Sequence, residues 1–337
     1  MKLLSLLFIN YFIVFSSKIF CFYKTTCFRN LNFANSINIF IMTHKDFNNT
    51  MNNQIYKIVV DDKTQLKNKY NLQVIYADKG KLYPKRNSYA EMSKLYYIYE
   101  LYRNGTLSSK YIGLNHYRRY FNFLDKIPDL DKIFENYDVI LNKKNHFTKS
   151  FKKLYCACTL CKPLEEVIKI IKEKKPEYYQ TAIESLNAKE GYYFNIFIMK
   201  KGDFFKYCEF IYDILFELDR RHNFTSDKDI INYLENYYPK KLVYYHLRIQ
   251  GFLSERLSTI FFKHNFKRIK TFPIVKLNTK LTEDKKRKND KKNYFNINKY
   301  NFFFFLLLMT WIILIIKIRL NIDKKDDNKN NIIIIYK

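Results

Sequence analysis

Residues 116–119 bring together the cationic side chains with the clearest potential for chemistry. The stretch 111–121 begins like a buried strand and then presents His116, Arg118 and Arg119. Residues two apart on an extended strand share a face, so His116 and Arg118 are expected to reach one ligand. Guanidinium groups stay charged and bind phosphate bidentately. The pattern predicts an anion site at the carboxyl edge of an α/β sheet. An arginine pair bonded to neighbouring carboxylates is the alternative.

The end of the first predicted strand carries further polar residues. Residues 38–42 form an apolar run typical of the opening strand of a nucleotide-binding α/β domain. Thr43, His44 and Lys45 follow it, and we expect them to bind the same anion. Two more strands are predicted, at 55–60 and 72–76. The acidic pair after residue 60 is more typical of a turn than of a metal site.

A helix is predicted over residues 87–102. Asn87 or Ser88 can cap it, and Glu91 lies three residues after Ser88, as a capping box requires. The cationic strand follows directly. Helix followed by strand therefore places residues 111–121 inside an alternating α/β unit.

The second half of the chain continues the alternation. Residues 137–141 and 191–199 predict strands, the second with Asn195 in its middle. Residues 203–218 predict an amphipathic helix capped by Asp203. Helical patterns also cover two further ranges, 151–179 and 248–262.

Composition limits the classes of function. A hydrophobic content of 47%, with 31 Phe and 30 Tyr, supplies an ample core, and the presence of only 6 Gly and 6 Pro argues against a disordered chain. The formal net charge of +28 would suit a nucleic-acid binder. The lysines are dispersed, however, and no finger or aromatic-basic strand motif is present, so we expect no nucleic-acid partner. A nucleotide diphosphate would use the same positive field.

Apolar runs near both ends predict a membrane protein. Residues 1–36 contain a run that fits a signal peptide or signal anchor. Residues 37–270 form the predicted folded domain. A basic linker at 271–300 leads to a predicted transmembrane helix at 301–320, and a polar tail follows at 321–337. The N-terminal extension favours a eukaryotic secretory membrane (endoplasmic reticulum or Golgi) over a bacterial-type inner membrane.

Several motifs together resemble a family of bacterial capsular and exopolysaccharide biosynthesis proteins, a glycosyltransferase-like domain of unknown function. The most distinctive motif is Gly113-Leu-Asn-His-Tyr-Arg-Arg-Tyr-Phe121. The other motifs keep the family's order over roughly residues 38–265: Ile41-Met-Thr-His-Lys45, Asn87 with Tyr89-Ala-Glu91, Phe194-Asn-Ile-Phe-Ile-Met-Lys200, Asp213-Ile-Leu-Phe-Glu-Leu218 and Gly251-Phe-Leu-Ser-Glu-Arg-Leu257. The resemblance implies an α/β, GT-A-like (Rossmann-like) nucleotide-sugar-binding domain, with helices flanking a mixed central sheet. In this chain, the predicted hydrophobic helices near the two ends would be added to that domain.

The resemblance also implies an activity. Such a protein would move a hexose from a nucleotide-diphosphate sugar donor to a glycan or lipid-linked acceptor. Many GT-A enzymes hold a divalent metal on the diphosphate with a D-x-D motif. Here the corresponding strand ends in His116-x-Arg118, so Arg118 and Arg119 could replace the metal. We therefore assign no metal ligand, and a role for Mn²⁺ or Mg²⁺ stays open.

Glycosyl transfer also needs a group that takes the acceptor proton. Glu255, at the start of a predicted helix in the last motif, is the preferred catalytic base, with Asp138 and Glu91 as weaker candidates. A helix-start charge or salt bridge is an equal alternative for Glu255. Four residues are expected to bind the sugar or the acceptor: Asn87, Glu91, Asn195 and Arg256. A satisfied core amide is the alternative for Asn195.

Two patterns suggest metal binding only weakly. The strings Asp129-Leu-Asp131 and Asp227-Lys-Asp229 follow no clear apolar strand. Three close thiols could bind zinc with Cys208 or His146, but the two-residue spacing typical of zinc sites occurs only once. We expect disulfides or plain buried thiols instead. The three thiols are Cys156, Cys158 and Cys161.

One alternative function is a non-catalytic membrane protein that keeps the fold as a binding or scaffolding module. Such a module need not retain affinity for a nucleotide diphosphate. Nucleotide-sugar binding therefore separates the two hypotheses. A nucleic-acid-binding membrane protein, with steep salt-dependent binding to any DNA or RNA, is a further alternative.

Overall fold

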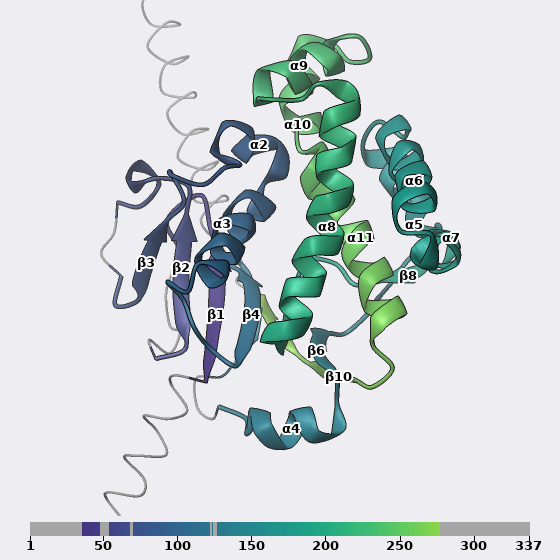
Figure 1. Cartoon of the computed structure of the whole chain (residues 1–337). Coiled ribbons are helices and arrows are strands. Elements are labelled where there is room, and N and C mark those ends of the chain that lie inside the picture. The colour runs from purple at the N-terminus through teal and green to yellow at the C-terminus, as the bar shows by residue number, and fades with distance from the viewer. Residues whose placement is uncertain (1–35, 48–53, 68–69, 122, 124–126, 277–337) are drawn as a thin grey trace, which may run out of the picture. The chain divides into compact units, whose positions relative to one another are not determined.

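The computed structural model describes residues 36–47, 54–67, 70–121, 123 and 127–276 (Figure 1). Within these residues, no helix combines the length and apolar character that a membrane crossing needs. The predicted signal segment before residue 36 and the predicted transmembrane helix at 301–320 lie outside the described residues. Ordered strands continue to Lys276, a few residues into the predicted linker.

A mixed nine-stranded sheet organises the fold, with β10-β6-β9-β4-β1-β2-β3 as its main path. Strand β5 pairs with β4 at one side of that path, and β11 pairs with β5. Along the path only β9 is antiparallel to its neighbours. The carboxyl ends of the other six strands therefore share one edge. The nine strands are β1 (Ile37–Met42), β2 (Tyr56–Val60), β3 (Gln73–Tyr76), β4 (Tyr111–His116), β5 (Arg119–Phe121), β6 (Val139–Asn142), β9 (Phe197–Lys200), β10 (Ile269–Phe272) and β11 (Ile274–Lys276).

The centre of the sheet is buried on both faces, as the near-continuous apolar runs of parallel strands require. Every residue of β1 is buried. Gly113 of β4 has side chains against both sides of its backbone, and a Cβ there would lie 2.9 Å from Cγ1 of Ile39. A larger residue at this position would have to displace the side chains of Ile39 and Ile198.

Helices cover the sheet and meet each other beside it. Helix α3 contacts β1, α8 contacts β4 and β9, and α11 packs against both helices (Figure 1). The helices are α2 (Arg86–Tyr89), α3 (Glu91–Arg103), α4 (Leu130–Asn136), α5 (Phe151–Cys158), α6 (Lys162–Lys174), α7 (Tyr179–Asn187), α8 (Lys201–His222), α9 (Asp227–Glu235), α10 (Lys240–His246) and α11 (Ile249–Asn265). A second, two-stranded sheet joins β7 (Asn145–His146) to β8 (Glu190–Gly191). The predicted α/β fold, with helices flanking a mixed sheet, is confirmed.

The predicted helix over 87–102 is broken in two. Helix α2 ends at Tyr89 and α3 begins at Glu91, because Ala90 between them has a positive φ of 52°. The predicted capping box is wrong, since the Ser88 hydroxyl donates to the carbonyl of Lys85 instead. The break allows Gly251 of α11 to approach Ala90 closely.

The predicted strand over 191–199 is also interrupted. Phe194 and Asn195 have φ values of 78° and 50°, so the chain turns between β8 and β9. Asn195 therefore lies before β9 rather than in mid-strand. Asp203 lies in the first turn of α8 and is not its cap, which is Lys200.

Candidate functional site

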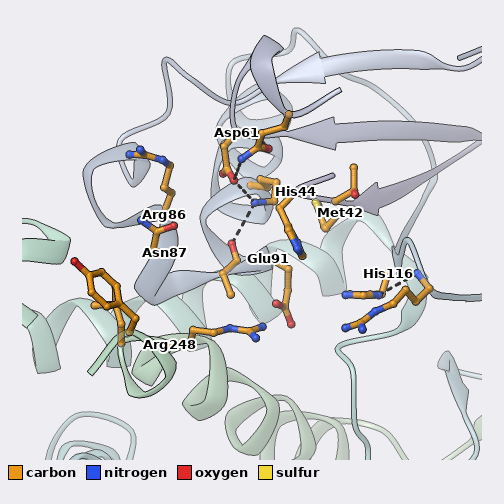
Figure 2. Close-up of a pocket in the computed structure, with 15 residues that line it drawn as sticks. Met42, His44, Asp61, Arg86, Asn87, Glu91, His116 and Arg248 are labelled. Carbon is orange, nitrogen blue, oxygen red and sulfur yellow. Dashed lines mark hydrogen bonds and ion pairs between the residues drawn. The ribbon is translucent and has the colours of Figure 1, made fainter. Parts of the chain in front are cut away.

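A pocket opens where the strand order reverses. From β1 the sheet extends through β2 and β3 on one side and through β4 on the other. Open α/β sheets bind ligands at such a switch point, outside the carboxyl ends of the strands. The pocket has a volume of about 470 Å³ (Figure 2), which falls within the usual range for small-molecule sites. Its walls come from the ends of β1, β2 and β4, from α2 and α3, and from the α10–α11 junction.

The chain turns at the end of β4 rather than continuing as an extended strand. Strand β4 ends at His116, and β5 starts at Arg119 and runs antiparallel to β4. The backbone N–H of Arg118 donates to Nδ1 of His116 over 3.1 Å. Burial, followed by Arg118 and Arg119, lowers the pKa of His116 to about 3. Its neutral ring therefore offers Nε2–H as a donor. The expected shared strand face was wrong, although His116 and Arg118 both line the pocket.

Neither Arg118 nor Arg119 takes part in an ion pair within the described residues. Nε of Arg118 is buried and has no hydrogen-bond partner there. The Arg118 guanidinium lies 5.2 Å from the ring centroid of Tyr117. Arg119 lies outside the pocket lining, with its guanidinium 4.0 Å from the ring centroid of Phe194. Arg118 is therefore placed to bind a ligand in the pocket, whereas Arg119 packs on Phe194 outside it.

Thr43 and His44, after β1, line the pocket, whereas Lys45 does not. The Thr43 hydroxyl donates to the backbone carbonyl of Lys45 over 2.6 Å and so shapes this loop. Burial, followed by Lys94 and other cations, lowers the pKa of His44 to about 4. The His44 ring is therefore neutral at pH 7. Lys45 is exposed, with its ammonium 5.9 Å from the ring centroid of Tyr117.

A buried ion pair closes the side of the pocket at the end of β2. Nζ of Lys94, on α3, lies 2.8 Å from Oδ2 of Asp61, and both side chains are less than a tenth exposed. Gln65 donates to the same carboxylate over 3.1 Å. The sequence assigned the acidic pair to a turn. This assignment holds for Asp62, which caps a 3-10 turn, but Asp61 lines the pocket.

Two arginines that sequence reasoning missed also line the pocket: Arg86 in α2 and Arg248 immediately before α11. Neither forms an ion pair within the described part of the chain. In Figure 2, Arg248 and His116 approach Glu91 from different sides. Arg248 lies far from β4 along the chain, so no local sequence pattern could place it in the same pocket as His116.

Two of the predicted sugar or acceptor ligands, Asn87 and Glu91, line the pocket. The Asn87 amide donates to Asp227 over 2.9 Å. Oε1 of Glu91 accepts from the Asn195 amide over 3.1 Å. Asn195 is only 2% exposed and also hydrogen-bonds Ser254 and Ser258, so it orients Glu91 from below the pocket surface.

Glu255 lies on α11 behind the pocket lining, with a side chain 14% exposed. It accepts from the backbone N–H of Phe194 over 3.3 Å and from Arg256 over 3.0 Å. Burial raises the pKa of Glu255 to about 7, against the opposing effect of Arg256, and Glu91 raises it further. Arg256 itself is buried and also donates to the Tyr193 hydroxyl, so it positions Glu255 rather than lining the pocket.

Asp138 is not brought to the site. It precedes β6, at the opposite edge of the sheet from the pocket, and its carboxylate binds Arg268 over 2.7 Å. That geometry argues against a catalytic role, which the sequence had left open for this residue.

The remaining metal candidates serve other contacts. Asp129 caps α4, Asp131 binds Lys110, and Asp229 belongs to the capping box of α9. Cys156 and Cys161 form a disulfide, while Cys158 and Cys208 are free thiols. Within the described residues, no cluster of three His, Cys, Asp or Glu side chains could hold a metal ion. The two carboxylates that line the pocket, Asp61 and Glu91, are already bonded to Lys94 and Asn195.

Comparison with known proteins now gives the family. Residues 38–266 match the model described as a domain of unknown function, DUF4422. The chain belongs to this family. Among solved structures, this DUF4422 protein is similar to the apo form of WbbM, described as a bifunctional glycosyltransferase, with 23% identity and a TM-score of 0.55. The match covers 73% of this chain and 46% of that one, so this chain spans less than half of the WbbM chain. The likeness shows the fold.

A second solved structure, the mannosyltransferase Ktr4p from S. cerevisiae, matches with 11% identity and a TM-score of 0.24 over 61% of this chain and 56% of that chain. That likeness is too weak to support an argument. No curated protein matches this DUF4422 chain. A capsular or exopolysaccharide role therefore stays a prediction.

Proposed function

We propose that this DUF4422 protein is a glycosyltransferase that moves a hexose from a nucleotide-diphosphate sugar to a glycan or lipid-linked acceptor. The observation that carries the proposal is that Arg118 and Arg248, from distant parts of the chain, line one pocket at the switch point of the sheet, with Arg86 in the same lining. None of the three has a carboxylate partner within the described residues, so their charge is available to a diphosphate. Family membership and the fold shared with a solved glycosyltransferase support it.

In the proposed reaction, the bond between the anomeric carbon and the diphosphate oxygen breaks, and the diphosphate leaves with the electron pair. An acceptor oxygen forms the new bond to that carbon and gives its proton to a carboxylate. Arg118 and Arg248 stabilise the charge that develops on the diphosphate. The uncharged ring of His116 donates a further hydrogen bond from Nε2–H to the diphosphate.

The nucleoside is placed on the β2 side of the pocket. In nucleotide-binding α/β folds, an acidic residue after the second strand commonly hydrogen-bonds the ribose. Asp61 occupies that place here, and Lys94 and Gln65 hold its carboxylate. Arg86 lines the same pocket, and its guanidinium donates to the backbone carbonyl of Tyr83 over 3.1 Å.

Glu255 is assigned as the base that takes the proton of the acceptor hydroxyl. A pKa of about 7 suits a base that works near neutral pH. Glu91 lies close enough to raise that pKa and lines the pocket, so it can orient the acceptor hydroxyl. Asn87 lines the same pocket and can bind a sugar hydroxyl through its amide oxygen, because its nitrogen binds Asp227.

Membrane attachment and a secretory location remain part of the proposal. They rest on the apolar sequence runs near the two ends of the chain, which lie outside the described residues. A lipid-linked acceptor would suit a protein held at a membrane.

The deciding experiment presents the full-length protein, in detergent, with a panel of nucleotide-diphosphate sugars. Calorimetry measures binding, and release of nucleoside diphosphate measures turnover. We expect one nucleotide class to bind and to be hydrolysed or transferred. Loss of both nucleotide binding and turnover in a folded protein would favour the scaffolding alternative. No binding at millimolar concentration, combined with salt-sensitive binding to arbitrary DNA or RNA, would overturn the proposal.

A further inference from the structure

A second cleft opens on the same edge of the sheet as the pocket. It lies at the carboxyl ends of β6 and β10 and has a volume of about 250 Å³. Strand β9 is antiparallel to both β4 and β6, so β4 and β6 point the same way and their carboxyl ends share an edge. None of the residues that line the pocket lines this cleft.

The lining of the cleft combines aromatic rings with amide oxygens. Phe194 and Phe272 contribute the rings, and Asn142 and Asn145 contribute the amides. The side-chain oxygens of both asparagines are buried and have no hydrogen-bond partner among the described residues. Buried polar atoms without partners are uncommon and call for an explanation. A ligand with hydroxyl donors and an apolar face would satisfy both features.

Phe194 connects the cleft to the pocket. It lines the cleft, and the guanidinium of Arg119, next to the pocket residue Arg118, lies 4.0 Å from its ring centroid. Its φ of 78° is strained for a residue with a side chain, and such strain is concentrated at functional sites. The Phe194 backbone N–H donates to Glu255, so the proposed base holds the wall between the two sites.

We propose that this cleft binds one sugar ring of the acceptor glycan. The inference rests on the proposed glycosyltransferase function and adds the location of the acceptor and the chemistry that selects it. The cleft is smaller than typical drug-sized sites, as a single ring requires. The rings of Phe194 and Phe272 contact the apolar face of the sugar, and Asn142 and Asn145 accept hydrogen bonds from its hydroxyls after small side-chain rotations.

The test uses full-length protein in detergent and a panel of methyl glycosides of common hexoses. Saturation-transfer NMR detects binding of each glycoside. We expect at least one glycoside to bind, and Asn142→Leu to weaken that binding by about tenfold or more, as the loss of one hydrogen bond of about 1.4 kcal/mol implies. Asn115→Leu is the matched control, because Asn115 is also a buried amide without partners but lies outside both sites.

Three outcomes would overturn the inference: no glycoside binds, Asn142→Leu binds as well as wild type, or inorganic phosphate displaces the glycoside. The last would indicate an anion site built on Lys143 and Lys276, which also line the cleft. If Asn142→Leu fails to fold, Asn145→Leu replaces it. Nucleoside-diphosphate binding is measured on the same samples. If it is retained while glycosides fail, the acceptor site alone is refuted; if it is absent from wild type, the proposed function is refuted.

Discussion

At the residue scale, Arg118 is the side chain on which donor binding should depend most. Its guanidinium lines the pocket, its Nε has no partner among the described residues, and it lies next to neutral His116. A cation already paired with a carboxylate would have to break that pair before binding phosphate. Arg118 has no such pair to break within the described structure.

We therefore expect Arg118→Ala to weaken nucleotide-diphosphate binding by about 10- to 100-fold, because hydrogen bonds to charged groups contribute about 1.5–3 kcal/mol. Calorimetry on the folded variant measures the change. Arg103→Ala removes the same charge from an exposed position on α3 and should leave affinity unchanged. Equal losses in both variants would mean that net charge, rather than this contact, binds the donor.

The pH dependence of activity should report Glu255. A base must be deprotonated, and burial raises the pKa of Glu255 to about 7. We expect kcat/KM to rise about tenfold per pH unit up to that value and then to level off. The pKa values of His116 and His44, about 3 and about 4, place their titration below this range. If the pH profile of kcat/KM for Glu255→Gln kept the same rise below pH 7, another residue would be the base.

The same carboxyl group should affect stability in the opposite direction. Glu255 keeps its proton in the folded protein up to a pKa of about 7, whereas its ordinary pKa is 4.5. Its stabilising contribution is therefore complete below the lower value and is lost as the pH rises through the higher one. We expect wild type to lose at most about 3 kcal/mol relative to Glu255→Gln across this window. Denaturant unfolding at several pH values measures the difference, and parallel curves would contradict it.

At the element scale, the break between α2 and α3 aligns the pocket residues Asn87, Ala90 and Glu91. Ala90 has a positive φ, and a Cβ on Gly251 of α11 would lie 3.0 Å from the Ala90 Cβ. We expect Gly251→Ala to lower the free energy of unfolding by about 1 kcal/mol or more through this overpacking. Ala90→Gly should restore most of that loss in the double variant, because it removes the opposing Cβ. Additive effects in the double-mutant cycle would exclude the contact.

The sequence predicted most strands and helices because their periodicity is local. The apolar runs at 38–42, 55–60 and 111–116 became β1, β2 and β4. The failures lie where tertiary contacts override local pattern. The close packing of Gly251 accompanies the break at Ala90, and Glu255 holds the turn at Phe194. Gly251 and Glu255 are both distant in sequence from the breaks that they contact. The local sequence pattern therefore predicted an unbroken helix and an unbroken strand.

The candidate site was predicted in part for the same reason. His116, Arg118, Thr43 and His44 follow strands directly, and strand ends are visible in a sequence. Pocket residues from helices and their junctions depend on how α3, α10 and α11 pack. Arg86, Lys94 and Arg248 belong to this second group, and nothing in their local sequence marks them. Asp138 was predicted as a site residue but is not one. It precedes β6, so it lies at the amino edge of the sheet, away from the pocket.

At the scale of the whole molecule, the pocket and the cleft divide one edge of the sheet. The pocket lies over β1, β2 and β4, the cleft lies over β6 and β10, and the wall formed by Arg119 and Phe194 lies between them. This arrangement would bring a donor and an acceptor together at the central strands. The amino edge, where Asp138 binds Arg268, would remain free of substrate.

Hydrogen–deuterium exchange can test this division on the intact protein. A saturating nucleoside diphosphate should slow exchange in the loops at 43–47, 61–65 and 116–118, because a bound ligand suppresses local opening. A bound methyl glycoside should instead slow exchange at 142–145 and 193–194. Peptides from the amino edge, at 109–111 and 137–139, are the internal control and should change with neither ligand. If the nucleotide protected 142–145 and left 116–118 unchanged, the positions of the two substrates would be reversed, because the ligand that needs the arginines would then lie away from them.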